Sequence, residues 1–164
     1  MAVDAVTIEG LDQRLRRLKA FPKEMSARGG PVRAGVRKGA MVIVNQAKAN
    51  VRAIVAAPNE SGIDESTGLL EKSISTFRSK ARPGEQGETY VVSVKRTAKY
   101  SGKGKRNTAT INAARLEYGT SRRKPMPFMR PAFHAKKNEA VKVMIEETEK
   151  GIAKIEKKLA ATAP

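Results

Sequence analysis

The chain has 164 residues, enough for one domain, and a net charge of +17. It has no cysteine and one histidine, which excludes disulfides, cysteine nucleophiles and metal sites built on two histidines. Hydrophobic residues make up 40% and aromatic residues 4% of the chain, so the core is lean and self-assembly is a natural source of further stability. Without signal-peptide features or a long apolar run, we expect a soluble protein made in a reducing compartment.

The positive charge is concentrated in one part of the chain. Residues 89–138 contain 13 Lys and Arg and a single acid, Glu117, for a net +12. Residues 1–88 have a net charge of +5, and residues 139–164 are balanced. This concentration predicts contact with an anionic partner, either a nucleic acid or an acidic protein face.

The first elements are predicted from hydrophobic spacing. Residues 6–8 alternate apolar and polar side chains before Gly10, which predicts a short strand and a turn. Leucines four and three apart over residues 11–18 predict a short amphipathic helix that ends near Pro22.

A long central helix is predicted over residues 31–56, beginning at Pro31 and ending before Pro58. Its expected apolar face, at helical spacing, comprises Val32, Val36, Ala40, Ile43, Ala47, Val51 and Ile54. Gly35 and Gly39 interrupt good helix formers. They are compatible both with close approach of another backbone and with simple tolerance.

A hairpin is predicted next, after a polar, acidic loop at residues 59–66. Residues 67–74 lead into an extended segment that ends near Ser79, and residues 82–87 have the composition of a turn. Residues 89–95 are rich in β-branched and aromatic side chains, as strands are. We expect the two extended pieces to pair antiparallel.

A flexible basic loop is predicted over residues 96–110. Its cations are candidates for contact with DNA or with an acidic partner: Arg96, Lys99, Lys103, Lys105 and Arg106. The basic loop also includes Tyr100, whose ring could stack on a base. The next segment, residues 111–118, fits both a strand and a short helix.

A proline-rich stretch precedes the last helix. Gly119 permits a sharp turn, and three prolines between Pro125 and Pro131 stiffen the chain; we call residues Pro125–Pro131 the proline arm. A stiff arm loses little entropy when it docks, either on a neighbouring protein or on its own core. The last helix is expected over about 131–160, with a heptad-like seam formed by Val141, Ile145, Thr148, Ile152, Ile155 and Leu159.

Catalysis is not expected. The only histidine, His134, lies near the start of the last helix, where a structural role is the simpler interpretation. No cluster of acids that could hold a metal is evident, and Gly102-x-Gly104-Lys105 lacks the spacing of a phosphate-binding loop. We therefore predict no enzyme activity, no metal and no cofactor.

Several motifs occur in an order that resembles a known family. They are Val6-Thr7-Ile8-Glu9-Gly10-Leu11, Ala47-Lys48 in an Ala-rich helix, Thr67-Gly68-Leu69-Leu70 before Ser73-Ile74, Glu117-Tyr118-Gly119-Thr120, and Pro127-Phe128-Met129-Arg130-Pro131-Ala132. Over about residues 6–135 the chain resembles the neck and tail-completion (head–tail joining) family of long-tailed double-stranded DNA bacteriophages. The basic loop and the heptad-like helix do not map onto that family.

The resemblance implies a non-catalytic virion structural protein at the neck or tail end, assembled in the host bacterial cytoplasm. It implies a homo-oligomeric ring, a hexamer or dodecamer by family analogy, that contacts connector, tail-terminator or tail-tube proteins and no membrane. The expected interface residues are Tyr118, Gly119, Thr120, Pro125, Met126, Pro127, Phe128, Arg130 and Pro131. Transient contact with genomic DNA or an acidic partner would use the basic loop together with Arg122, Arg123 and Lys124.

Residues 1–164 are thus expected to form a single α+β domain. We predict a three- or four-stranded, mostly antiparallel sheet packed with the long central and C-terminal helices. As the lone acid among thirteen cations, Glu117 is expected to pair with a nearby arginine and to pin the turn. The alternative function is a basic nucleic-acid-binding protein of ribosomal or nucleoid type, which fits the charge but shows no known DNA or RNA motif.

Overall fold

A computed structural model describes residues 30–57, 67–79, 88–96 and 108–161. Its elements are α2 (Pro31–Ala56), α3 (Leu69–Ser73), β1 (Ile74–Ser79), β2 (Thr89–Val94), α4 (Ala109–Tyr118) and α5 (Met129–Ala161). The predicted α+β class and the two long helices are confirmed. Among the helices of these ranges, none is long and apolar enough to cross a membrane.

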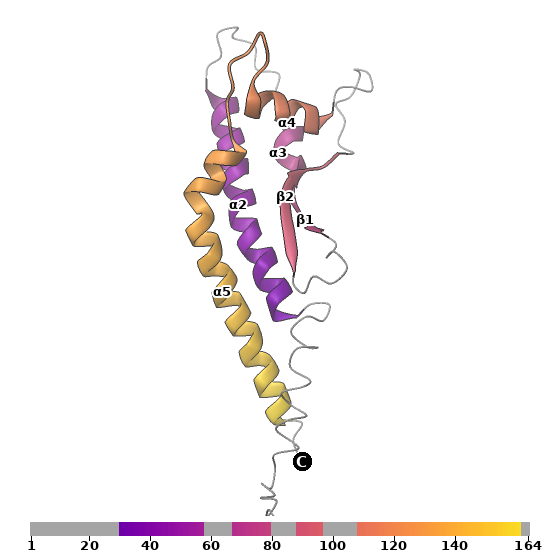
Figure 1. Cartoon of the computed structure of the whole chain (residues 1–164), viewed down its shortest axis with the longest axis vertical. Coiled ribbons are helices and arrows are strands. Elements are labelled where there is room, and N and C mark those ends of the chain that lie inside the picture. Colours follow the sequence, from indigo (N-terminus) through magenta and orange to yellow (C-terminus); the bar gives the residue numbers. More distant parts are fainter. Residues whose placement is uncertain (1–29, 58–66, 80–87, 97–107, 162–164) are drawn as a thin grey trace, which may run out of the picture.

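Three layers make up the molecule, with α2 in the middle (Figure 1). The long helix α5 runs beside α2 on one side, and the hairpin of β1 and β2 lies on its other side (Figure 1). The short helices α3 and α4 close one end of this arrangement. The hydrophobic core is at that end, where α2, α3, α4, the hairpin and Phe128 meet.

Helix α2 has the predicted bounds, but its buried face is only partly the predicted one. Ala47 and Val51 are buried as expected, whereas the other predicted positions are only partly buried. In the first half of the helix, the buried positions are Pro31, Gly35 and Gly39. The interface is therefore centred on small residues instead of aliphatic ones.

Glycines let α2 and α5 approach closely. A Cβ atom added to Gly39 would lie 2.7 Å from the carbonyl oxygen of Ala140, and one added to Gly35 would lie 2.6 Å from that of Met144. Gly151 of α5 is packed in the same way against Pro31, whose Cβ would be 2.5 Å from an added methyl. Of the two interpretations of Gly35 and Gly39, close approach of another backbone is therefore the correct one.

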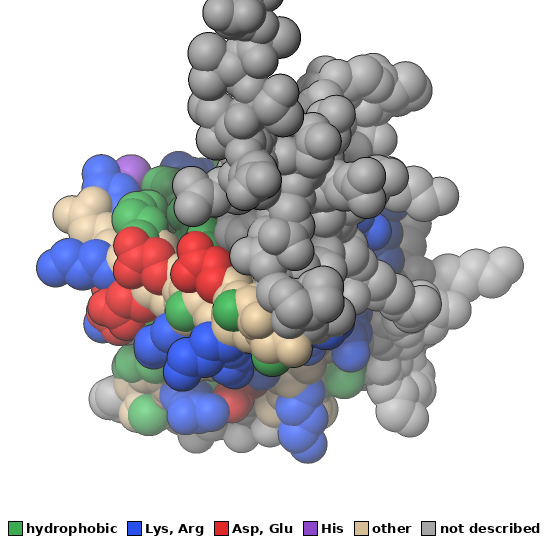
Figure 2. Space-filling view, turned by 90° about the horizontal axis from the view of Figure 1, so that it is seen from below, with side chains coloured by type: hydrophobic (Ala, Val, Ile, Leu, Met, Phe, Trp, Pro, Cys, Tyr) green, Lys and Arg blue, Asp and Glu red, His purple; other side chains and the backbone are tan. Residues whose placement is uncertain are grey.

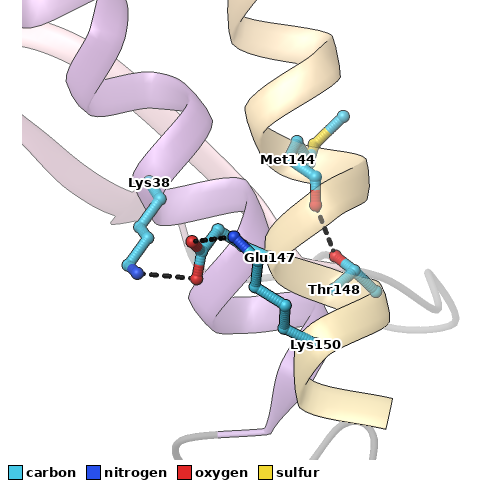
Figure 3. A network of polar contacts seen from close by, with 5 residues as sticks. All are labelled: Lys38, Met144, Glu147, Thr148 and Lys150. Atoms are coloured by element: carbon cyan, nitrogen blue, oxygen red, sulfur yellow. Dashed lines mark hydrogen bonds and ion pairs between the residues drawn. The ribbon is translucent and has the colours of Figure 1, made fainter. Parts of the chain in front are cut away.

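Polar contacts flank this helix pair (Figure 3). Lys38 Nζ of α2 forms an ion pair with Glu147 Oε2 of α5 at 2.6 Å, and Lys150 approaches the same carboxylate at 3.5 Å. The hydroxyl of Thr148 donates to the carbonyl oxygen of Met144 at 2.7 Å, so it is satisfied within its own helix where the backbones are close. The hydrogen bond from Lys38 lowers the pKa of Glu147 below its ordinary value.

Helix α5 begins two residues before the predicted start, and its predicted seam is partly wrong. Thr148, Ile152 and Ile155 are partly buried, but Val141 and Ile145 are exposed. Ala132 and Ala140 are the buried apolar residues of this helix. Ala140 lies against Gly39 of α2, where small residues let the two helix backbones approach closely. The side chain of Leu159 lies outside the described part.

The predicted antiparallel hairpin is confirmed, with Ile74 opposite Val94 and Phe77 opposite Val91. Ile74 and Val94 face α2 and are buried, whereas Phe77 and Val91 point to the other face and are exposed. Within the described ranges the sheet has these two strands. Residues 111–118, which had fitted either a strand or a helix, belong to α4.

Several predicted features lie outside the described residues. They are the strand at residues 6–8, the helix at 11–18, the acidic loop at 59–66, the turn at 82–87 and most of the basic loop, residues 97–107. A third or fourth strand is not confirmed by the part of the chain that the structure describes.

Candidate functional site

The two halves of the proline-rich motif meet at the start of α5. Glu117, in the last turn of α4, accepts hydrogen bonds from the backbone N–H groups of Phe128 and Met129, both at 2.9 Å, and of Arg130 at 3.1 Å. The first N–H groups of a helix have no partner within it, and they form the positive end of the helix dipole. A carboxylate from another helix satisfies three of them here and so fixes α5 onto α4.

Gly119 reverses the chain between these two helices. Its φ is +78°, which favours glycine, and an added Cβ would lie 2.9 Å from the carbonyl oxygen of Arg123. Thr120 and Arg123 then close a tight turn, because the backbone N–H of each donates to the carbonyl oxygen of the other. The backbone N–H of Met126 donates to the carbonyl oxygen of Leu116 at 2.7 Å, which returns the chain to the end of α4. The expected sharp turn at Gly119 is confirmed.

Glu117 is nearly buried yet charged. Burial by itself raises the pKa of this carboxyl, but the hydrogen bonds from Met129, Phe128 and Arg130 and the charge of Arg130 outweigh burial. The pKa of Glu117 therefore lies below its ordinary value. The expected arginine partner is Arg130, whose Nε lies 3.5 Å from the carboxylate. The backbone nitrogens at the start of α5 lie closer to the Glu117 carboxylate than Arg130 Nε does, and the sequence did not predict these backbone hydrogen bonds.

Phe128 belongs to the core of its own subunit. Its side chain is 1% exposed and packs among the buried residues of α2, α4 and the hairpin. Asn50 of α2 donates to the carbonyl oxygen of Phe128 at 2.9 Å, and Gln46 donates to Asn50 at the same distance. The expectation that Phe128 contacts a neighbour is therefore corrected: this residue anchors the proline arm to the core. Met126 is partly buried against that core and has the same role.

The rest of the predicted interface lies on the surface. Tyr118 is 70% exposed, and the guanidinium of Arg130 lies over its ring, 4.7 Å from the centroid. Pro125, Pro127 and Pro131 are exposed along the same segment. Thr120 is exposed and Gly119 is partly buried. The proline arm is thus anchored to the core by Phe128 and Met126, and its prolines are exposed beside the ring of Tyr118.

The cations of the candidate anion site lie in two places. Arg122, Arg123 and Lys124 are exposed in the turn after Gly119. Arg96, at the end of the hairpin, is exposed as well. Lys99, Lys103, Lys105 and Arg106 lie outside the described ranges, so the structure does not place them relative to the turn.

Asn50 is the residue that sequence analysis missed. It occupies a helix position beside the buried Val51, and its amide joins α2 to the first residue before α5. An asparagine has a low intrinsic preference for a helix interior, and this preference was the available signal. In the described residues no group of three or more His, Asp or Glu could hold a metal ion. His134 is exposed, with its ring edge-on to Phe133.

A scan against models of protein families, a search of the curated proteins and a search of the solved structures found no match to this chain.

Proposed function

We propose that this protein is a virion structural subunit of the neck or tail-completion ring of a long-tailed bacteriophage. Identical copies would assemble between the capsid connector and the tail, in contact with connector, tail-terminator or tail-tube proteins. The proposal assigns the chain no catalytic step and no cofactor. Its location would be the virion, after assembly in the bacterial cytoplasm.

One observation carries the proposal: the two separated halves of the family-like motif form one device. Glu117 comes from the first half, and the N–H groups of Phe128, Met129 and Arg130 come from the second. Direct contact between the two halves supports the interpretation that they form one motif, which the order of residues in the sequence alone does not. The device holds Tyr118 and the prolines of the arm at the surface, where another subunit can reach them.

The surface composition also supports assembly. An aromatic ring, three exposed prolines and four exposed cations lie on one short segment, residues 118–131, and combine apolar anchors with charge. Stiff segments of this kind bind with a small entropy cost, and repetition around a ring adds modest contacts into a durable joint. We also propose the three- or four-stranded, mostly antiparallel sheet expected from the sequence, of which the described residues form two strands.

Genetic complementation tests this function. A phage that encodes this chain is deprived of the gene, and the wild-type chain or a Tyr118→Glu variant is supplied from a plasmid. Tyr118 is exposed, so the substitution leaves the core intact while placing a negative charge on the proposed interface. We expect the wild type to restore joined, infectious particles and the variant to leave heads and tails separate in electron micrographs.

The matched control is Ala114→Glu, which adds the same charge at an exposed position of the same helix α4. This variant should restore infectivity. If the phage without the gene still forms normally tailed, infectious virions, the proposed function is wrong.

A further inference from the structure

The turn after α4 and the first turns of α5 together form one exposed surface. Figure 1 shows this part of the chain beside α4 at one end of the molecule, whereas the last turns of α5 lie at the other end. We call it the basic aromatic surface, and it consists of six exposed residues: Tyr118, Arg122, Arg123, Lys124, Arg130 and Phe133.

Hydrogen bonds fix the backbone of the turn that contains three consecutive cations. The N–H of Thr120 donates to the carbonyl oxygen of Arg123 at 2.9 Å, and the N–H of Arg123 donates back at 3.3 Å. The N–H of Arg122 donates to the hydroxyl of Thr120, also at 3.3 Å. The first and last residues of such a turn lie within about 7 Å of each other, so the cations are clustered on a small area. An ordered cluster loses little backbone entropy when it binds a partner.

Two exposed aromatic side chains lie next to Arg130. The guanidinium of Arg130 is over the ring of Tyr118, which is 70% exposed. Phe133 is 50% exposed and follows Arg130 by three residues, a spacing that makes the two side chains neighbours on the helix surface. The ring of Phe133 also meets that of His134 edge-on. Aromatic and arginine side chains are enriched at the centres of interfaces between proteins.

The charge of this surface is not neutralised within the described residues. Glu117 is the only acid among residues 89–138, and its buried carboxylate accepts the three N–H bonds at the start of α5. Arg130 shares that carboxylate at 3.5 Å, whereas the three cations of the turn form no ion pair with any described residue. The turn is therefore left with its full positive charge.

The far end of α5 has a different surface, because its charges are balanced. Residues 139–161 contain five lysines and five glutamates. Figure 2, which views the molecule from that end, shows Lys and Arg side chains next to Asp and Glu side chains. The two ends of α5 therefore differ in charge, and the far end supplies matched control positions.

We propose that the basic aromatic surface docks on an acidic face of another virion protein. The proposal rests on the proposed function for placing the chain in a virion, and it adds the chemistry of the partner. Guanidinium groups bind carboxylates through two parallel hydrogen bonds, while Tyr118 and Phe133 pack on apolar side chains between the acids of the partner. Duplex DNA is a less suitable partner, because its phosphates and sugars give the two aromatic rings no apolar surface to pack on.

Photo-cross-linking in assembled particles tests the partner. A benzophenone amino acid replaces Phe133 or, in a second variant, Tyr118, and each chain is supplied from a plasmid to a phage deprived of the gene. After irradiation of purified virions, we expect cross-links to a segment of another virion protein in which Asp and Glu outnumber Lys and Arg, as identified by mass spectrometry. The same amino acid at the exposed Ala153, about 30 Å further along α5, is the control and should not cross-link to that segment.

Charge reversal tests the same contact through particle assembly. Arg122→Glu combined with Arg123→Glu should lower the yield of infectious particles about tenfold or more, because like charges then face each other across the contact. Replacement of two acids in the cross-linked segment by arginine should restore most of this yield. The control, Lys154→Glu combined with Lys157→Glu, changes the net charge equally at exposed positions of α5 and should leave the yield unchanged. Both double variants should melt near the wild-type temperature.

Several outcomes would overturn the inference. They are cross-links to DNA, to a second copy of this chain or to a segment without an excess of acids, no cross-link at all in infectious particles, and a normal yield from the reversed turn. In each of them the chain is still present in joined virions, so the proposed function stands. Particles that lack the chain altogether would refute the proposed function, and the inference with it.

Discussion

At the scale of single residues, the structure gives Glu117 and Gly119 of the Glu117-Tyr118-Gly119-Thr120 motif separate roles. Its carboxylate joins the end of α4 to the start of α5, while Gly119 supplies the reversal between them. The arginine partner was predictable because Glu117 is the only acid in a cationic segment. The backbone donors were not, because the start of α5 was expected two residues later, at Pro131.

Glu117→Gln should destabilise the fold by about 1–3 kcal/mol at neutral pH, since a buried amide cannot accept all three N–H bonds. The folded pKa of Glu117 is lowered, so the stability it contributes is present above the ordinary value of about 4.3 and is lost as the pH falls through the folded pKa. The gap between wild type and variant should therefore shrink at acid pH. Urea unfolding at several pH values measures this gap.

The exposed Glu149→Gln serves as the control and should have little effect on stability at any pH. A destabilisation by Glu117→Gln that stays constant from neutral to strongly acid pH would contradict the role of the carboxylate charge at the start of α5.

At the scale of elements, helix and strand positions were largely predictable, and packed faces were less so. The bounds of α2 follow from Pro31 and Pro58, and the hairpin follows from alternating β-branched residues. The buried face of α2 was partly misassigned because hydrophobic spacing ignores glycine, whereas Gly35 and Gly39 lie against the backbone of α5. Helix α4 could have been recognised from its ends: Thr108 accepts from the N–H of Ile111, and Gly119 follows the last turn.

Gly39→Ala separates helix propensity from packing. Propensity alone predicts a gain of about 1 kcal/mol for alanine in a helix interior. The added Cβ would lie 2.7 Å from the carbonyl oxygen of Ala140, so the two helices must move apart. We expect a net loss of about 1–3 kcal/mol in the free energy of unfolding.

Chemical denaturation measures this loss, with Asn45→Ala on the exposed side of α2 as the matched control. The control should be neutral or slightly stabilising. A Gly39→Ala protein that is more stable than the wild type would show that close approach of the two backbones is not required.

At the scale of the whole molecule, the charge is the property that admits both an assembly function and a nucleic-acid function. The net charge of the chain is +17. Exposed cations of the described structure include Arg96 and the three residues of the turn at 122–124. The sequence could not decide between the two functions, because long-range attraction does not distinguish phosphate from carboxylate. Nor did the heptad spacing identify the packed side of α5, since Val141 and Ile145 are exposed and Ala140 is buried.

Binding of duplex DNA over a range of salt concentrations separates the two functions. For a structural subunit we expect only non-specific binding, with a dissociation constant of about 1 µM or weaker at physiological salt and a steep loss as salt increases. Alanine at Arg122, Arg123 and Lys124 should reduce the salt slope by no more than about 3 units. Sequence-specific, much tighter binding by the monomer would favour the nucleic-acid-binding alternative.

The location of the chain in mature particles tests the central claim most directly. Gold-labelled antibodies against the purified protein are applied to virions of a phage that encodes it, and the particles are viewed by electron microscopy. The proposed function predicts label at the junction between head and tail or at the end of the tail that joins it. Virions that contain none of this protein, as judged by the label and by mass spectrometry of the same particles, would contradict it.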